Sequence, residues 1–331
     1  MGIRDTDKVH RFFILRSVIL KNFLRPVVAA GMIAASFAAI SQSGSYSYGG
    51  STYSSGGSWS DGLRCESSDG SRRSSSLQVV GLTSDQRLLC FNENKPGEAR
   101  NIGAVNGMAS GDMLIGIDYR VQDKKLYGVS QTGNVYILDT ADASATFVNR
   151  LSVPLAGSSF GVDFNPVADR LRIVSDTGQN LRHNVNAGGL TVVDDPLDYP
   201  PATPTNAVGP NATGVTGSAY TNNDLNASTS TTLYALDTNL DQVALQSPPN
   251  DGTLAATGKL GIDAAAPVGF DIYSTIRDGV TVNVQALASL QMAAGATSLY
   301  SISLPTGKAT SRGAFSSQNK VIGIAIPLNQ L

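Results

Sequence analysis

The chain has 331 residues and a formal net charge of −2, with only 15% charged and 7% aromatic residues. This length allows one large domain or two modest ones. The near-neutral charge, with no basic stripe after residue 77, argues against a nucleic-acid partner, because binding to phosphates needs a concentrated basic surface.

Residues 1–40 are typical of a signal peptide or a signal-like leader. Six basic residues precede an apolar run of 15 residues (26–40), and Ala39 and Ser41 give an A-x-A-like cleavage site. An uncleaved membrane anchor or an ordinary tail are the alternatives, but the run is shorter than the ~20 residues that span a bilayer. We therefore expect a secreted, periplasmic or cell-surface bacterial protein that meets the membrane only through this transient segment.

Residues 41–76 are rich in Ser, Gly and Tyr and contain almost no aliphatic side chains. Such a segment cannot bury enough apolar surface to offset its ordering entropy, so we expect a flexible linker rather than a sticky tract. The two cysteines of the chain are Cys65 and Cys90. They either form one disulfide that ties the linker to the following domain, or remain two free thiols.

From residue 77 onwards, short runs of Val, Ile, Leu and Tyr alternate with Gly, Asn, Asp and Thr, which predicts an all-β domain. One motif recurs five times, as LIGIDYR, FGVDFNP, TGSAYTN, VGFDIYS and IGIAIPL. Its glycines are spaced by 45, 56, 52 and 54 residues, at Gly116, Gly161, Gly217, Gly269 and Gly323. A period of about 50 residues in an all-β sequence favours a propeller.

Each repeat contains four short strands joined by tight turns, the pattern of a propeller blade. The first unit has only three strands (78–105), whereas the last copy of the motif (321–327) stands alone at the end of the chain. We therefore expect residues 77–331 to form a five-bladed β-propeller closed by pairing the C-terminal strand with the N-terminal blade. Closure would leave no exposed sheet edge, and the motif glycine would let the innermost strands crowd near the axis.

The stretches GIDYR, LYGVSQTGNVYILD, FGVDFNPVADRLRIVSDTGQNLRHN, TTLYALDTNLDQVALQSPPNDGTL and GFDIYS resemble the bacterial DUF4394 family. The resemblance covers roughly residues 77 to 328, and its most specific part is NPVADRLRIVSDTGQNLR (165–182). It implies an exported bacterial protein of uncharacterised role. No catalytic residues of the family exist to be transferred.

Three of the five motif copies carry an aspartate two residues after the glycine, namely Asp118, Asp163 and Asp271, where the other copies have Ala219 and Ala325. In a closed ring these positions share one level around the axis. Three carboxylates at one level repel one another, so they need a cation, basic partners or raised pKa values.

Three roles follow for these candidate metal-binding and catalytic residues. In a structural role each aspartate caps a turn or pairs with an arginine, as Asp163 could with Arg170 or Arg172 across its hairpin. In a second role the three hold a hard cation such as Ca²⁺ in the central tunnel, although no cofactor is required. In a third they act as the paired acids of a glycoside hydrolase, a hypothesis by fold-level analogy alone.

Arg170 and Arg172 lie on one face of a predicted strand, with Leu171 and Ile173 on the other. Together with Asp176 they form a candidate ligand-binding group for an anion. The alternative is internal salt bridging to Asp163, Asp169 or Asp176.

Three further segments resemble functional motifs or have the composition of a binding loop. GSSFG (157–161) matches a nucleophile elbow around Ser159, but a strand follows where the elbow needs a helix. DTNLD (237–241) matches the start of a Ca²⁺ loop, but the later ligand positions do not fit and a hairpin turn is favoured. The Pro-rich excursion 198–214 is either a partner-contact loop or a disordered insertion.

The sequence also lacks a P-loop and a dinucleotide fingerprint, and its two histidines and two cysteines are too few for a zinc site. Nucleotide chemistry and transition-metal catalysis are therefore disfavoured. We expect a non-catalytic binding or scaffold module whose partner is an extracellular glycan, a protein or another copy of itself. The alternative is a carbohydrate-active hydrolase that uses Asp118, Asp163 and Asp271.

Overall fold

The computed structural model describes Cys65 and residues 76–201, 209–226, 228–292 and 295–330. The chain divides into two units, Met1–Ser58 and Trp59–Leu331, and every described residue belongs to the second. The expected leader (1–40) lies outside the described residues, as does the linker (41–76) apart from Cys65 and Ser76. Within the described part of the chain, no helix is long and apolar enough to cross a membrane.

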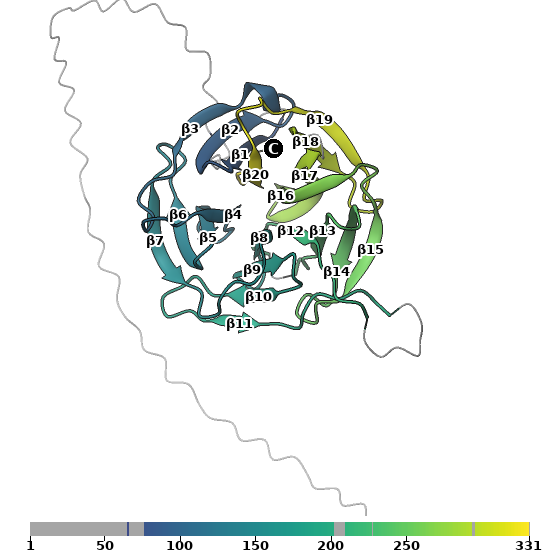
Figure 1. Cartoon of the computed structure of the whole chain (residues 1–331). Helices are drawn as coiled ribbons and strands as arrows, with labels where there is room; N and C mark the ends of the chain where they lie inside the picture. Colours follow the sequence, from purple (N-terminus) through teal and green to yellow (C-terminus); the bar gives the residue numbers. More distant parts are fainter. Residues whose placement is uncertain (1–64, 66–75, 202–208, 227, 293–294, 331) are drawn as a thin grey trace, which may run out of the picture. The chain divides into compact units, whose positions relative to one another are not determined.

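The described residues form five four-stranded antiparallel sheets arranged around a central axis, the all-β five-bladed propeller expected from the sequence (Figure 1). A single 3-10 turn, η1 (Pro96–Glu98), interrupts blade 1. The strands of blades 1 and 2, from the inside outwards, are β20 (Val321–Ala325), β1 (Gln78–Thr83), β2 (Arg87–Asn92) and β3 (Arg100–Ala104), then β4 (Leu114–Tyr119), β5 (Leu126–Ser130), β6 (Asn134–Leu138) and β7 (Ala145–Arg150).

Blades 3 to 5 repeat this order. Blade 3 contains β8 (Phe160–Asn165), β9 (Arg170–Ser175), β10 (Asn180–His183) and β11 (Thr191–Val193). Blade 4 contains β12 (Val215–Tyr220), β13 (Leu233–Asp237), β14 (Gln242–Gln246) and β15 (Leu254–Lys259). Blade 5 contains β16 (Ala264–Arg277), β17 (Val280–Met292), β18 (Thr297–Ile302) and β19 (Ala309–Ala314).

The last strand of the chain belongs to the first blade. β20 pairs antiparallel with β1, with Val80 opposite Ala325 and Gly81 opposite Ile324. This is the pairing expected between residues 322–326 and 79–83. Because the inner strand of blade 1 comes from the far end of the chain, the termini of the domain hold each other in place.

The hydrophobic core consists of five clusters of buried side chains, each lying between two adjacent blades. Val80 and Leu114 belong to the cluster between blades 1 and 2, for example. Val79 and Tyr273 belong to the one between blades 5 and 1, and the remaining three boundaries have their own clusters. Outer strands such as β7 and β15 are mostly exposed, which is why their sequences are more polar.

Four of the five motif glycines stand where the inner strand of the next blade leaves no room for a side chain. A Cβ on Gly161 would lie 2.6 Å from the backbone nitrogen of Ser218, and one on Gly269 would lie 2.6 Å from that of Ile324. Gly323 differs, because its nearest neighbour would be 3.6 Å away, an ordinary van der Waals contact. The spacing of the inner strands therefore requires glycine at four copies of the motif and tolerates a methyl group at the fifth.

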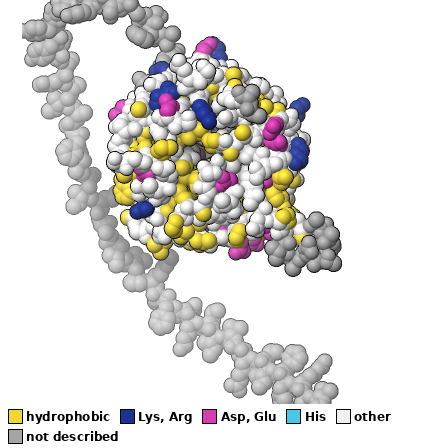
Figure 2. All heavy atoms as spheres, in the orientation of Figure 1, with side chains coloured by type: hydrophobic (Ala, Val, Ile, Leu, Met, Phe, Trp, Pro, Cys, Tyr) yellow, Lys and Arg dark blue, Asp and Glu magenta, His cyan; other side chains and the backbone are white. Residues whose placement is uncertain are grey.

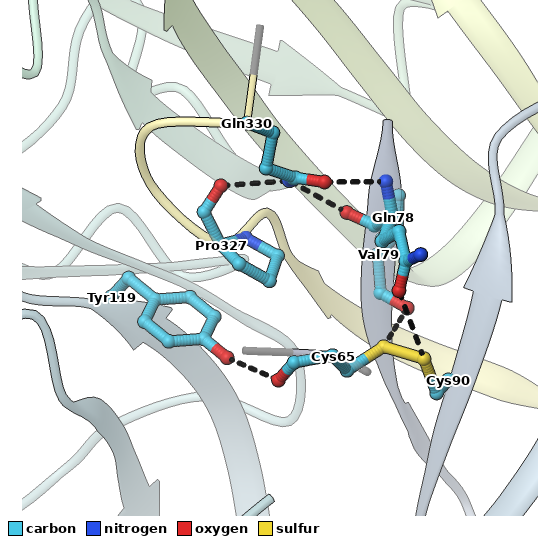
Figure 3. The surroundings of a disulfide bond; sticks show 7 residues. All are labelled: Cys65, Gln78, Val79, Cys90, Tyr119, Pro327 and Gln330. Carbon is cyan, nitrogen blue, oxygen red and sulfur yellow. Dashed lines mark hydrogen bonds between the residues drawn. A yellow bond between two sulfur atoms is a disulfide. The ribbon is translucent and has the colours of Figure 1, made fainter. Parts of the chain in front are cut away.

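A disulfide joins Cys65 to Cys90 on β2, which settles the two alternatives left open for these residues (Figure 3). The Tyr119 hydroxyl, at the end of β4, donates a hydrogen bond to the Cys65 carbonyl oxygen at 3.3 Å. At the same end of blade 1, the Gln330 side chain accepts from the Gln78 backbone N–H at 2.7 Å and donates to the Gln78 carbonyl oxygen at 3.0 Å. Cys65 is thus covalently attached to blade 1 and hydrogen-bonded to blade 2.

We expect Gly161→Ala to lower the free energy of unfolding by about 1–3 kcal/mol, because the new methyl group meets backbone atoms that cannot rotate away. The matched variant Gly323→Ala should change it by less than about 1 kcal/mol. Denaturant unfolding of the two variants measures both values. Equal destabilisation by the two substitutions would show that close approach is not what selects these glycines.

Reduction of the disulfide should destabilise the domain. The bonded cysteines are 25 residues apart, so loss of the cross-link should cost about 3–4 kcal/mol through the entropy gained by the unfolded chain. Thermal melts with and without a reductant test this. A Cys65→Ala, Cys90→Ala double variant should melt at the lower temperature in both conditions. A wild-type melting temperature that is the same with and without the reductant would contradict the prediction.

Candidate functional site on the propeller axis

The three motif aspartates meet on the axis. Asp118 lies on β4, Asp163 on β8 and Asp271 on β16, and each contributes a carboxylate oxygen within 4.8 Å of the other two. Their exposed fractions are 6%, 3% and 3%. The expectation that these residues share one level in the ring therefore describes their positions correctly.

Each carboxylate reaches across to the next blade and accepts a hydrogen bond from its backbone. Asp118 Oδ2 accepts from Phe164 N–H on β8 at 2.7 Å, and Asp163 Oδ1 accepts from Tyr220 N–H on β12 at 2.9 Å. Asp271 Oδ2 accepts from Ile326 N–H, one residue beyond β20, at 2.6 Å. In all three cases the donor lies three residues after the motif glycine of its own blade.

Blades 5 and 2 follow the motif copies that carry alanine. In these two blades the N–H group of the inner strand bonds to the aspartate of its own strand. No carboxylate stands at Ala219 or Ala325 to accept from the next strand. Ile272 N–H therefore bonds Asp271 Oδ1 of its own strand at 2.5 Å, and Tyr119 N–H bonds its neighbour Asp118. Three carboxylates thus accept N–H groups from all five inner segments.

Burial raises the pKa of all three carboxyl groups. For Asp118 and Asp163 burial is the largest cause, and repulsion from the neighbouring carboxylates lifts each pKa further above its ordinary value. Burial raises the pKa of Asp271 to about 6, against the opposing effect of the N–H bonds from Ile326 and Ile272. Because the groups interact, they titrate as a set, which holds protons at pH values where exposed carboxyls are ionised.

The same three residues are the set that could hold a hard cation, which has a preference for carboxylate oxygens. At least one oxygen of each carboxylate already accepts a backbone N–H group, whose partial positive charge opposes cation binding. Protonation relieves the repulsion without any further ligand. Ca²⁺ in the tunnel therefore stays a prediction from the sequence, and protonation of the carboxyl groups is an alternative way to remove their repulsion.

The carboxylates do not open onto a substrate-sized cleft. The axial cavity beside them is lined by all five motif glycines and by residues such as Ile115, Phe160 and Ile322. Its volume is about 10 Å³, room for roughly one water molecule. Glycosidases hold their two carboxyl groups roughly 5–5.5 Å or 6.5–9.5 Å apart, with the sugar between them, whereas these oxygens lie within 4.8 Å with no such space.

The expected partners of Arg172 require correction, whereas the charge of Arg170 does interact with Asp169, one of its expected partners. Arg172 is 1% exposed and pairs with Asp194 at 2.5 Å, not with Asp163, Asp169 or Asp176. Its remaining hydrogen bonds go to Asn180, to Asn250 of blade 4 and to the Tyr220 hydroxyl. The sequence argument considered only acids near the hairpin, whereas Asp194 follows β11 and reaches back across the blade.

The other two members of the candidate ligand-binding group also have internal partners. Arg170 donates to the carbonyl oxygens of Ala168 and Asp169 at 3.2 and 2.8 Å. Asp176 accepts from Ser158 N–H at 2.9 Å and from its hydroxyl at 2.5 Å. The structure therefore does not bring Arg170, Arg172 and Asp176 together as one anion site, and Arg172 has no free nitrogen for an external ligand.

Several interblade polar contacts could not be anticipated from the sequence. Arg120 follows β4 and donates to both carboxylate oxygens of Asp169 in blade 3, at 2.7 and 2.5 Å. His183 is fully buried, and its ring nitrogens hydrogen-bond with Thr191 and with Asn149 of blade 2. Burial and the nearby Arg170 charge lower the pKa of His183 to about 4. These residues are far apart in sequence, and no local signal links them.

The remaining motifs take structural positions. Both ring nitrogens of His183 are engaged, so this histidine is not available as a base for Ser159. Asp237 accepts from Asn239 N–H and Leu240 N–H at 2.9 and 3.0 Å, which makes DTNLD the β13–β14 turn. In the 198–214 excursion, Tyr199 N–H bonds the Pro210 carbonyl oxygen at 3.1 Å, and residues 202–208 lie outside the described part.

Residues 87–325 match the family model described as "Domain of unknown function (DUF4394)", so the chain belongs to this family, as its resemblance indicated. The match covers four complete blades and most of blade 1. No curated protein matches the sequence.

Several solved structures match this chain at low sequence identity and low structural similarity. A candidate 6-phosphogluconolactonase from Bacteroides uniformis is 13% identical, with 73% of this chain and 83% of that one covered, at a TM-score of 0.36. A protein of unknown function from Bacteroides thetaiotaomicron is 14% identical, with 77% and 68% covered, at a TM-score of 0.40. An auxiliary nutrient binding protein from Bacteroides ovatus is 13% identical, with 54% and 46% covered, at 0.33.

The raised pKa values predict that the three axial aspartates destabilise the fold less at acidic pH than at neutral pH. A group whose pKa is raised on folding contributes its full stability below its unfolded pKa, close to the ordinary value of 3.8, and loses it as the pH rises through the folded pKa. Asp163→Asn removes one acid and keeps an oxygen for Tyr220 N–H. Relative to wild type, this variant should therefore gain about 1–3 kcal/mol in free energy of unfolding between pH 4 and pH 7.5.

Denaturant unfolding at the two pH values measures this change, and the exposed Asp251→Asn controls for loss of one negative charge. The comparison with wild type cancels the opposite contribution of His183, whose lowered pKa removes stability as the pH falls from 6.5 towards 4. A difference between Asp163→Asn and wild type that does not change with pH would contradict shared protonation. A wild-type melting temperature that falls on adding a chelator would show instead that a cation holds the carboxylates together.

Proposed function

We propose that this protein is an exported, non-catalytic binding or scaffold module. The observation that carries the proposal is the burial of Asp118, Asp163 and Asp271 in hydrogen bonds between blades. A carbohydrate-active enzyme needs at least two acids open to one cleft at a separation suited to its chemistry. Here the candidate acids join the blades to one another.

The surface supports recognition of a macromolecule. Apolar side chains of Leu190, Val192 and Val193, at and beside the outermost strand of blade 3, are 69%, 46% and 62% exposed. β11 is an outer strand with one unpaired edge, and exposed apolar edges are places where another chain can bind. On the face drawn in Figure 2, Lys and Arg side chains are scattered and do not form one patch. Such a surface favours a protein partner, either foreign or a second copy, over a polyanion.

The described parts of the excursion that follows β11 lie at one end of the propeller. Antiparallel strands alternate in direction, so residues 194–201 and 209–214 lie at the end where the inner strands begin. Cys65 and Gln330 contact the opposite end, beside Tyr119 and Gln78. The described part of the excursion and the contacts of Cys65 therefore lie at opposite ends of the propeller.

Hydrolytic activity is tested directly. The full chain, secreted from its expression host, should release no more product from a panel of chromogenic glycosides than Asp163→Asn does, because the acids lack access to substrate. Turnover by wild type that the Asp163→Asn variant loses would overturn the non-catalytic assignment.

Binding is tested with a matched pair of surface variants of the full chain. Val192→Lys with Val193→Lys should weaken co-sedimentation with cell envelopes of the producing bacterium, or self-association in sedimentation velocity, by about tenfold. Val280→Lys with Val282→Lys, which changes exposed residues of β17, should have little effect. Full retention of both activities by the β11 variant would exclude this edge as the binding surface.

A further inference from the structure

A second cavity lies far from the axial carboxylates, at the end of blade 2 where β4 and β6 end. Its volume is about 480 Å³, within the ~300–1,000 Å³ range of ligand pockets. Turns 120–125 and 139–144 surround it, and no residue discussed above as a candidate acid or base contributes to it. The apolar part of its lining consists of Leu126, Ile137 and Leu138, and its polar part includes Lys125, Asp139 and Thr146.

The attachment point of the N-terminal segment adjoins this pocket. Tyr119 lines the pocket, and its hydroxyl donates to the Cys65 carbonyl oxygen at 3.3 Å. Cys65 is itself 3% exposed and bonded to Cys90. The disulfide and the hydrogen bond from Tyr119, which lines the cavity, therefore hold the backbone of Cys65 close to the cavity (Figure 3).

The residues just before Cys65 carry a side chain that suits an apolar cavity. The sequence from residue 59 is WSDGLRC, and Trp59 is the single tryptophan of the chain. Six extended residues can span up to about 20 Å, enough to reach any part of a pocket that begins beside Cys65. Trp59 and Leu63 could bury apolar surface against the partly exposed Ile137, while Asp61 would lie among lysines such as Lys125.

We propose that the pocket at the end of blade 2 is the docking site of the chain's own segment 59–64, with Trp59 inserted as its anchor. The disulfide makes this association intramolecular, so the segment is present at a high effective concentration and needs little intrinsic affinity. Burial of a tryptophan ring removes a large apolar area from water. The docked segment would extend the attachment of the preceding chain from blade 1 to blade 2.

Such docking gives the propeller a defined orientation on whatever precedes it. A disulfide alone would leave the domain free to rotate about one bond. Contacts on two blades remove that freedom, and a scaffold that presents one surface to a partner gains from it.

Tryptophan fluorescence of the full chain tests the proposal, because Trp59 is the only source of indole emission. The emission should be shifted to the blue relative to the unfolded protein and protected several-fold from acrylamide quenching. Thr146→Arg, an exposed substitution within the pocket, should abolish the shift and the protection. Its control is Thr310→Arg, at the equivalent position of β19 in blade 5, which should leave both unchanged.

Two results would overturn the proposal. One is a wild-type tryptophan as accessible to acrylamide as in the unfolded protein, with the disulfide intact. The other is a protected tryptophan that Thr146→Arg does not release, which would place Trp59 elsewhere, including at a second copy if protection depends on protein concentration. Cooperative melting of both Arg variants establishes that they are folded. Reduction of Cys65–Cys90 gives a second readout that supports docking if it exposes Trp59.

Discussion

The close approach of five inner strands at the axis is the constraint on which the rest of the structure depends. At Gly161 and Gly269 the backbone of the next blade lies where a Cβ would stand. This proximity brings each aspartate, two residues further along, within hydrogen-bonding distance of the neighbouring backbone. It also reduces the axial cavity to about 10 Å³. The same close approach therefore lets the carboxylates hydrogen-bond to neighbouring blades and leaves them almost inaccessible to solvent.

Polar contacts connect neighbouring blades both at the axis and away from it. Aspartates accept backbone N–H groups at the centre, and apolar clusters fill the space between neighbouring blades. Further out, Arg120 binds Asp169 of the next blade, and Arg172 reaches Asn250 of the next blade while it pairs with Asp194. A buried charge is costly when it loses its partner, so these networks hold adjacent blades in one arrangement rather than allowing them to slide.

The two ends of the propeller carry different features because each blade has an even number of strands. The connections from an outer strand to the next inner strand all fall at one end, where the 194–214 excursion lies. The disulfide, the Gln330 contacts and the pocket beside Tyr119 lie at the other. These two groups of features therefore lie at opposite ends of the propeller.

The sequence by itself determined the number of blades, the identity of the inner strands, the partner of the last strand and the shared level of Asp118, Asp163 and Asp271. These features follow from a repeated motif, and a repeat keeps the same position in every unit. The disulfide was one of two alternatives, because spacing alone cannot show whether two cysteines meet. The choice of Asp194 for Arg172, and of backbone N–H groups for the aspartates, was decided only by the tertiary structure. The first contact crosses blade 3 from β9 to the residue after β11, and the others join neighbouring blades, so their distances depend on how closely strands and blades pack, which no local pattern of residues records.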